Sequence, residues 1–268
     1  MTLFESIFLG ATQGITEFLP ISSSGHLIIL EKLFGLNVES LKGFDVSLHI
    51  GTLLAILIYF RKDVLNMLKA CFRIVMLRFD KKDEYTKLIA FILIGTIPAI
   101  IVGGTVGGYL DEVFRSVRVV GGVMAATSLL FFYAEHVGKR SKKEEITGLR
   151  AFFIGLFQML ALIPGVSRSG ATISGGLINK MDREKAARFS FLLGIPAIAG
   201  AGLLTAFHTA KNGTFDVSAL PCMTAGLLAS FVIGLLAIAT LMKYLKKHSL
   251  NVFAYYRLIV GIAVVAFL

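Results

Sequence analysis

Long hydrophobic runs separated by short polar stretches extend along the whole chain. An α-helix needs roughly 17–25 predominantly apolar residues to cross a bilayer, and runs of this length recur. Between several of them lie short stretches that are rich in Lys and Arg. The pattern predicts membrane-spanning helices at residues 44–60, 88–108, 119–137, 189–208, 219–242 and 251–268.

Two further hydrophobic segments, residues 3–36 and 151–178, are interrupted in the middle. The interruptions read Pro20-Ile-Ser-Ser-Ser-Gly-His26 and Pro164-Gly-Val-Ser-Arg-Ser-Gly170. Proline removes a backbone donor and ends a helix, while serine and glycine favour a turn and cap the next helix. Each piece is short for a span, so each segment is predicted to be a re-entrant helix–turn–helix pair. A turn at membrane depth is tolerated only where it lines a polar cavity or is buried in protein.

The two halves of the chain resemble each other. The stretch from Phe18 to Gly25 parallels that from Leu162 to Gly170, and the stretch from Phe44 to Gly51 parallels that from Phe189 to Gly194. Each half would hold one re-entrant pair and three spans, an odd number that turns the second copy upside down. The predicted fold is therefore an all-α polytopic membrane protein with an inverted-topology repeat. It forms a single membrane domain over 1–268, with repeat one at 1–137, a basic cytoplasmic loop at 138–150 and repeat two at 151–268.

Composition and charge favour a membrane over nucleic acid as the partner of this chain. Of its 268 residues, 56% are hydrophobic and 16% are charged, and the mean hydropathy is +0.79. Soluble domains are about 45–50% apolar and about 25% charged. The net charge is +10, but the basic residues concentrate in short loops between spans, the positive-inside pattern of membrane proteins. The loops at 61–87, 138–150, 179–188 and 243–250 are predicted to be cytoplasmic.

Polar side chains gather at the two predicted turns. The first turn carries Gln13, Glu17, Ser22, Ser23, Ser24 and His26, and the second carries Ser167, Arg168, Ser169 and Thr172. An ionisable residue at membrane depth is costly and is a functional candidate by default. Each turn begins a helix, whose N-terminus offers unpaired N–H groups and a partial positive charge. Arg168 adds a bidentate donor suited to phosphate, so the two turns predict a site for a phosphate anion.

Glu17 would repel a phosphate unless it binds a divalent cation or acts as a base. Hard oxygen ligands suit Mg²⁺ or Ca²⁺. A hydroxyl beside a carboxylate and an imidazole can serve as an activated nucleophile, which points to Ser23 with Glu17 and His26. Arg168 would neutralise the charge that develops on a transferred phosphoryl group.

Structural roles are open to the same residues. The serines after Pro20 could do no more than cap a helix. Glu17 could pair with Arg168 and only hold the two halves together. The convergence of all these residues on two related breaks favours a functional site. Two other polar residues lie within spans. His49 could face the same cavity, but hydrogen bonding in the core is expected. Arg257 is predicted to extend toward the cytoplasmic interface.

The motifs Gln13-x-x-x-Glu17-Phe-Leu-Pro-Ile-Ser-Ser-Ser-Gly-His26 and Pro164-Gly-Val-Ser-Arg168-Ser-Gly-Ala-Thr172 resemble the two signatures of the bacterial undecaprenyl-pyrophosphate phosphatase family, bacitracin-resistance type. The resemblance covers essentially the whole chain, including its ending Tyr256-Arg257-Leu-Ile-Val. It implies hydrolysis of undecaprenyl pyrophosphate to the monophosphate in the bacterial inner membrane, with Mg²⁺ or Ca²⁺. That reaction recycles the carrier of peptidoglycan precursors and confers bacitracin resistance. Members of the family are similar in fold and often dimeric, with a site facing outward.

The first motif of the family is (Glu/Gln)-x-x-x-Glu, and this chain has the Gln form. The resemblance implies that Glu17 carries the acidic role, with Gln13 as a neutral metal ligand or hydrogen-bond partner. Glu17, Ser23, His26 and Arg168 match residues that the family uses, and either Ser23 or His26 could be the nucleophile. In the expected mechanism Ser23 attacks the terminal phosphorus and Glu17 or His26 takes its proton. The pyrophosphate is held by Arg168, the metal and the hydroxyls of Ser22, Ser24, Ser167, Ser169 and Thr172.

A transporter or flippase of undecaprenyl phosphate is the alternative, because inverted repeats with broken helices are common in transporters. Such a protein needs the anion site but not a hydroxyl beside a base. The site could open to either face of the membrane. The external, periplasmic face is expected, because the residues proposed for catalysis lie mainly on the first re-entrant pair.

Overall fold

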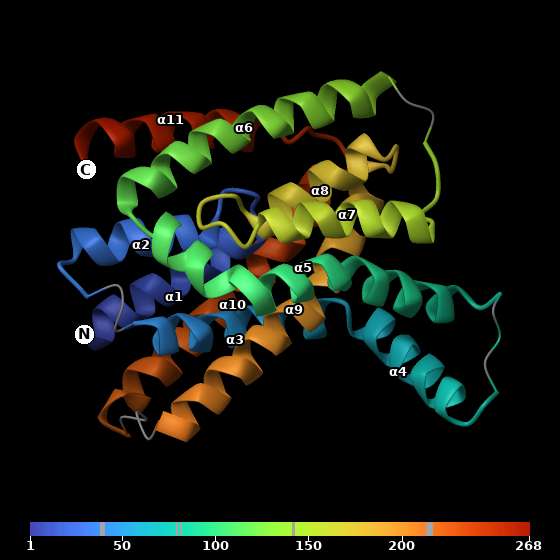
Figure 1. Cartoon of the computed structure of the whole chain (residues 1–268), viewed down its shortest axis with the longest axis horizontal. Helices are drawn as coiled ribbons and strands as arrows, with labels where there is room; N and C mark the ends of the chain where they lie inside the picture. Colours follow the sequence, from blue (N-terminus) through green and yellow to red (C-terminus); the bar gives the residue numbers. More distant parts are fainter. Residues whose placement is uncertain (38–40, 79, 81, 141–142, 213–216) are drawn as a thin grey trace.

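The computed structural model describes residues 1–37, 41–78, 80, 82–140, 143–212 and 217–268, and the regular elements in these residues are all helices (Figure 1). The predicted all-α class is confirmed. In chain order the helices are α1 (Leu3–Phe18), α2 (Ser23–Leu33), α3 (Lys42–Tyr59), α4 (Arg61–Val75), α5 (Glu84–Phe114), α6 (Val117–Arg140), α7 (Gly148–Leu160), α8 (Arg168–Ile178), α9 (Arg183–Asn212), the 3-10 helix η1 (Val217–Ala219), α10 (Leu220–Leu245) and α11 (Asn251–Phe267).

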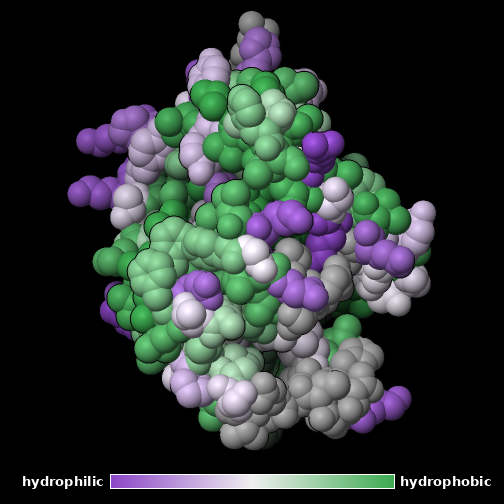
Figure 2. Space-filling view, turned by 90° about the vertical axis from the view of Figure 1, so that its left-hand side faces the viewer, coloured by the Kyte–Doolittle hydropathy of each residue, from purple (hydrophilic) through white to green (hydrophobic). Residues whose placement is uncertain are grey.

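Four helices in the described residues, α5, α6, α9 and α10, are long and apolar enough to cross a membrane. Helix α3 joins them as a fifth candidate if it is taken with α4, into which it bends by 84°. Helix α11 is apolar but has 17 residues, close to the lower limit for a span. Hydrophobic side chains cover much of the outer surface, as the end of the molecule in Figure 2 shows. The chain is thus a multi-pass membrane protein.

The prediction of a loop over residues 61–87 was wrong for its first half, which forms α4. The eight basic residues of this stretch suggested a solvated connection. Apolar residues nevertheless recur in it at the spacing of one helix face, which stabilises a helix against an apolar surface. The predicted loop at 138–150 is also shorter than expected, because α6 continues to Arg140 and α7 begins at Gly148. Residues 141 and 142 of that loop lie outside the described residues.

Packing in the two halves is compatible with an inverted repeat. Helix α1 packs along α10, and α7, its counterpart in the second half, packs along α5. Both contacts rely on glycines, because a Cβ on Gly10 would overlap the backbone of Gly226 and one on Gly155 would overlap the backbone of Gly95. The last helices of the two halves, α6 and α11, run side by side (Figure 1). The division into repeats at 1–137 and 151–268 stays a prediction.

The two interrupted segments form the helix pairs α1–α2 and α7–α8. Their helices have 16, 11, 13 and 11 residues, most of them well below the length of a span. The two turns come together in the middle of the bundle (Figure 1). Phe18, at the end of α1, is buried edge-to-face on Phe191 of α9, with 5.6 Å between ring centroids. This core contact fixes the position of the first turn against the second half of the chain.

Candidate active site

Ser22 and Ser167 occupy the same capping position at the start of α2 and α8. Both have a positive φ, 77° and 72°, and both side chains accept a hydrogen bond from the backbone N–H three residues on, at Gly25 (3.3 Å) and Gly170 (3.1 Å). A positive φ at a residue other than glycine costs about 1–3 kcal/mol and is concentrated at functional sites. The matched geometry places the next residues, Ser23 and Arg168, at equivalent points of the two helices.

Glu17 joins the two turns. Its Oε1 accepts a hydrogen bond from Arg168 Nη2 at 2.6 Å, and its Oε2 accepts one from the Ser23 hydroxyl at 2.7 Å. Gln13 Nε2 donates to the same Oε2 at 3.2 Å. The carboxylate is buried, with 6% of the side chain exposed. The structure therefore brings together four predicted site residues that come from both halves of the chain.

Helix α9 positions the side chain of Arg168. The sequence did not indicate this role of α9. Arg168 Nη1 donates to the backbone carbonyl of Ser190 at 3.0 Å. Gly194, one turn further along α9, leaves the space for the guanidinium, because a Cβ there would overlap Arg168 Nη1. The hydroxyl of Ser190 lies 2.5 Å from that of Thr172. Guanidinium, carboxylate and carbonyl thus hold one another in a fixed arrangement, as phosphate binding requires.

The other predicted hydroxyls are largely engaged within the protein. Ser22 and Ser167 serve as caps, and the Oγ atoms of Ser167 and Ser169 lie 3.4 Å apart. The Thr172 hydroxyl donates to the backbone carbonyl of Arg168 at 2.8 Å. Ser24, in the first turn of α2, is half-buried. These side chains surround the site, and their contact with a pyrophosphate stays a prediction.

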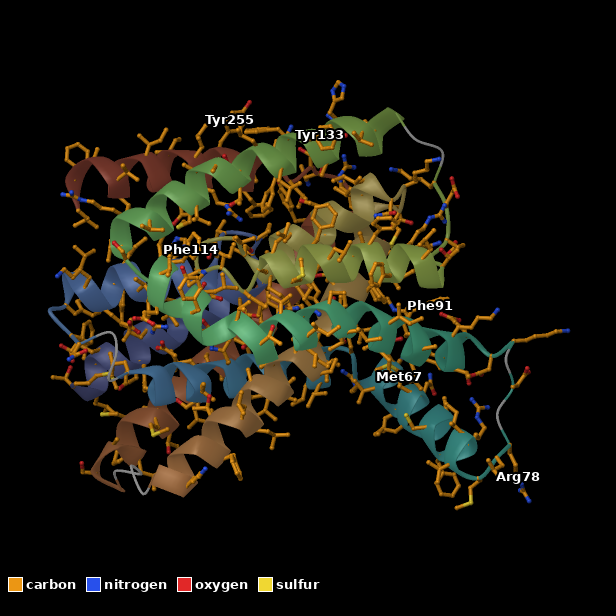
Figure 3. All side chains as sticks on the ribbon, in the orientation of Figure 1. Met67, Arg78, Phe91, Phe114, Tyr133 and Tyr255 are labelled. Atoms are coloured by element: carbon orange, nitrogen blue, oxygen red, sulfur yellow. The ribbon has the colours of Figure 1, made fainter. Side chains whose placement is uncertain are left out.

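His26 lies at the first turn but contacts a different partner. Its Nδ1 lies 2.8 Å from the Ser22 carbonyl, which requires a donor, so Nε2 is the acceptor in the neutral ring. Nε2 lies 2.8 Å from the hydroxyl of Tyr256 on α11, and the two rings stack at 5.7 Å. The neighbouring Tyr255 instead projects from the outer side of α11 (Figure 3). In the described residues, the Ser23 hydroxyl hydrogen-bonds to Glu17 rather than to His26.

His49 is both a core residue and a neighbour of the site. Its Nδ1 hydrogen-bonds the Asp45 carbonyl at 2.7 Å, as predicted. Its Nε2 also lies 3.8 Å from Glu17 Oε2, with 30% of the side chain exposed. The alternative that His49 faces the same cavity therefore also holds, because the packing of α3 in the bundle brings the ring to the first turn.

The prediction that Arg257 extends to the interface was wrong, because the side chain is fully buried. Its guanidinium donates to the carbonyls of Val166 (2.8 Å) and Gly165 (2.9 Å) in the second turn, and it lies 4.7 Å from the centre of the Phe131 ring. Turns expose carbonyls that no helix satisfies, and a buried cation with several donors can satisfy them. Arg257 thereby fixes the residues directly before Ser167 and Arg168.

The oxygen atoms beside Glu17 suit a hard divalent cation. Gln13 Oε1 is buried without a hydrogen-bond partner, although its amide nitrogen donates to Glu17. In the part of the chain that is described, no three His, Cys, Asp or Glu residues form a group able to hold a metal. Mg²⁺ commonly binds through one or two carboxylates and completes its shell with water and substrate phosphates. Glu17 and Gln13 fit such a site, but not a cage made by protein alone.

Comparison with known proteins places these motifs in a family. The family described as bacitracin resistance protein BacA matches residues 6–263. A protein named undecaprenyl-diphosphatase from Rubrobacter xylanophilus is 42% identical over 270 residues, covering 100% of this chain and 99% of the relative. Proteins of the same name from Alteromonas mediterranea and Geobacter sulfurreducens are 43% and 42% identical, covering 97% and 100% of this chain and 97% and 99% of their own.

Proposed function

Because this chain belongs to the bacitracin resistance protein BacA family, we propose that it is a membrane undecaprenyl diphosphatase. The reaction cleaves the terminal phosphoanhydride bond of undecaprenyl pyrophosphate to give undecaprenyl phosphate and inorganic phosphate. It returns the lipid carrier to cell-wall synthesis and confers resistance to bacitracin, which binds the pyrophosphate form. The prenyl tail stays in lipid while the pyrophosphate enters between the two turns.

The observation that carries the proposal is that one carboxylate holds both a hydroxyl and a guanidinium. The Ser23 hydroxyl donates to Glu17 Oε2 at 2.7 Å, which supports Glu17 as the proposed base and Ser23 as the proposed nucleophile. Ser23 Oγ attacks the terminal phosphorus, its proton passes to Glu17, and the anhydride bond to the lipid phosphate breaks. Water then hydrolyses the phosphoserine and regenerates the enzyme.

Arg168 stabilises the charge on the transferred group. Its guanidinium is positioned by Glu17 at 2.6 Å and by the Ser190 carbonyl at 3.0 Å, so little reorganisation is needed when the phosphoryl group arrives. The N-terminal N–H groups of α2 and α8 add partial positive charge on the same side. The hydroxyls of Ser24, Ser167, Ser169 and Thr172 are proposed to contact the non-transferred phosphate.

His26 has a separate task. In the neutral ring Nε2 accepts from Tyr256, which supports a role as the base that activates the water of the second step; protonation of the leaving phosphate would require the imidazolium form. Glu17 and Gln13 are the proposed metal ligands. When bound, Mg²⁺ or Ca²⁺ would screen the charge of the pyrophosphate.

The family and the charge pattern support a proposed location and assembly. We place the chain in the bacterial inner membrane, with its basic loops in the cytoplasm and the site open to the periplasm. A homodimer is the proposed assembly. The alternative function is transport of undecaprenyl phosphate. A transporter would need the anion site, but it would not need a carboxylate that accepts a hydrogen bond from the Ser23 hydroxyl.

Release of inorganic phosphate from undecaprenyl pyrophosphate by the purified protein tests the proposal. Wild type and Arg168→Ala are compared with Mg²⁺ and with EDTA. Cation-dependent release that Arg168→Ala abolishes is expected. A folded, monodisperse wild type that releases no phosphate with any cation would leave transport as the function.

A second comparison decides the nucleophile. Ser23→Ala is expected to abolish release, whereas His26→Ala is expected to slow it by about 10²–10⁴-fold, the usual contribution of a general acid or base. Near-full activity of Ser23→Ala, with none in His26→Ala, would exclude Ser23. The trapped phosphoenzyme, digested and sequenced by mass spectrometry, identifies the modified residue directly.

A further inference from the structure

Helix α4 lies across the end of the bundle instead of continuing through it. It leaves α3 at 84°, with only Phe60 between the two helices. A helix nearly perpendicular to a membrane-spanning one runs along the membrane surface. It belongs to the stretch of basic residues that the charge pattern assigns to the cytoplasmic side. We therefore take α3 alone as the span and α4 as a helix in the membrane interface, instead of the second half of a broken span.

The exposed surface of α4 divides into two parallel stripes. One is apolar, and its side chains are 55–75% exposed: Leu65, Leu68, Phe72 and Val75. The other is polar and basic, at the matching spacing of one helix face: Lys62, Asn66, Lys69 and Arg73. An apolar stripe beside a basic one is typical of helices that lie in the headgroup layer, with the apolar stripe in the acyl chains.

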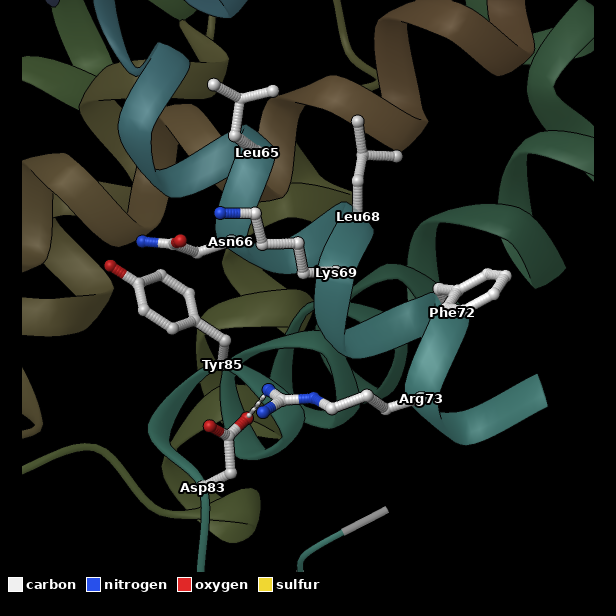
Figure 4. Close-up of a pocket in the computed structure, with 8 residues that line it drawn as sticks. All are labelled: Leu65, Asn66, Leu68, Lys69, Phe72, Arg73, Asp83 and Tyr85. Atoms are coloured by element: carbon white, nitrogen blue, oxygen red, sulfur yellow. Dashed lines mark ion pairs between the residues drawn. The ribbon is translucent and has the colours of Figure 1, made fainter. Parts of the chain in front are cut away.

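The basic stripe borders a groove of about 700 Å³ between α4 and the beginning of α5. Figure 4 shows Arg73 extending from α4 to Asp83 at the start of α5, while the amine of Lys69 lies on the side of Asn66 in the same groove. Arg73 forms an ion pair with Asp83 at 3.1 Å, with 47% of its side chain exposed. Lys69 makes no ion pair with any described residue. The groove thus has one unneutralised positive charge and the hydroxyl and amide groups of Tyr85 and Asn66.

We propose that this groove binds the phosphate of an anionic phospholipid from the adjacent leaflet. Lys69 meets the phosphate, and the exposed guanidinium of Arg73, already oriented by Asp83, adds hydrogen bonds. Leu65, Leu68 and Phe72 of the apolar stripe line the same groove, so the acyl chains lie against them and both parts of the lipid have a complementary surface. A free phosphate would use the polar side of the groove, at Lys69 and Arg73, but would gain nothing from these three apolar side chains. None of these residues belongs to the Glu17 site.

Lipid binding by the purified, delipidated full-length protein tests the proposal. Native mass spectrometry counts bound lipid, and thermal unfolding in detergent follows stabilisation, with phosphatidylglycerol, phosphatidylcholine or inorganic phosphate added. Phosphatidylglycerol is expected to bind and to raise the unfolding temperature more than phosphatidylcholine. Lys69→Glu is expected to weaken its binding by about fivefold or more, the factor that one basic residue near an anionic surface contributes.

Two further variants make the result decisive. Lys247→Glu makes the same charge change at another exposed lysine, after α10, and should bind phosphatidylglycerol like the wild type. Leu68→Ser should weaken phosphatidylglycerol binding while Lys69 is intact, because the acyl chains lose contact. Equal binding by Lys69→Glu and wild type would overturn the proposal. Stabilisation by inorganic phosphate that depends on Lys69, with no effect of Leu68→Ser, would make the groove a site for free phosphate instead.

Discussion

Glu17 and Arg168 are 151 residues apart in the chain, yet Glu17 Oε1 and Arg168 Nη2 lie 2.6 Å apart where the two turns meet. Each residue comes from a different half, so neither half can form the site alone. A buried carboxylate and guanidinium that share hydrogen bonds act as one unit, and the loss of either leaves a buried charge without its partner.

The first prediction is that Glu17 and Arg168 are strongly coupled in catalysis. Glu17→Gln and Arg168→Gln should each lower kcat by about 10²–10⁴-fold, through loss of the base or of transition-state charge stabilisation. The double variant should be scarcely slower than the slower single one, because residues that act together are not additive. Phosphate release is measured for the wild type, the two single variants and the double variant, which completes a double-mutant cycle. Multiplied losses in the double variant would show that the two residues act independently.

Gly194→Ala should disable the site without touching a polar group. The added methyl group would occupy the place of Arg168 Nη1 and displace the guanidinium. A displacement of about 1 Å can reduce a rate by roughly 10²-fold, so a loss of this size is expected in phosphate release. Gly200→Ala, on the same helix with no atom close to the new methyl group, is the matched control and should be fully active. Similar activity of Gly194→Ala and Gly200→Ala would contradict the packing of the Arg168 guanidinium against Gly194.

Tyr256→Phe should slow the reaction through His26. The change removes the hydroxyl that lies 2.8 Å from His26 Nε2 and keeps the stacked ring. A net hydrogen bond is worth about 0.5–1.5 kcal/mol, so kcat should fall by roughly two- to tenfold with KM little changed. Tyr255→Phe removes an exposed hydroxyl one residue away and should have no effect. A rise in KM with unchanged kcat would assign Tyr256 to binding instead.

Arg257→Met should destabilise the protein and its second turn. The methionine fills similar space but leaves the carbonyls of Gly165 and Val166 without donors. A buried acceptor without a partner costs about 1–3 kcal/mol, so thermal unfolding should begin at a clearly lower temperature. Arg118→Met, at an exposed position in the first turn of α6, controls for the loss of charge. Unchanged unfolding of Arg257→Met would mean that the turn keeps its shape without the guanidinium.

The sequence alone located both turns, because proline, serine and glycine affect the backbone locally. It also predicted that Glu17, Ser23 and Arg168 share a site, since two related breaks in an inverted repeat must meet. It missed Ser190, Gly194 and Tyr256, whose contacts with the turns depend on how α9 and α11 pack. No local pattern records such a contact across the bundle.

Helix α4 shows a different kind of error. The stretch from Arg61 to Val75 was assigned to a loop from its charge, although Leu65, Leu68, Phe72 and Val75 follow a helical period. Periodicity was the better guide, because basic residues are compatible with an exposed helix face as well as with a loop. Arg257 was misassigned for a related reason: arginine near a span end usually extends to water, but here unsatisfied carbonyls compete for it.

The matched caps at Ser22 and Ser167 have a consequence for how such a site can arise. Both turns present their next residue in the same way, so a pair of identical halves would set two serines, or two arginines, against each other. With two serines, no guanidinium would stabilise the charge of the phosphoryl group. With two arginines, the site would lack a nucleophile. The position after the cap, Ser23 in one half and Arg168 in the other, is therefore one at which a difference between the halves gives a symmetric frame the proposed division of labour between attack and charge stabilisation.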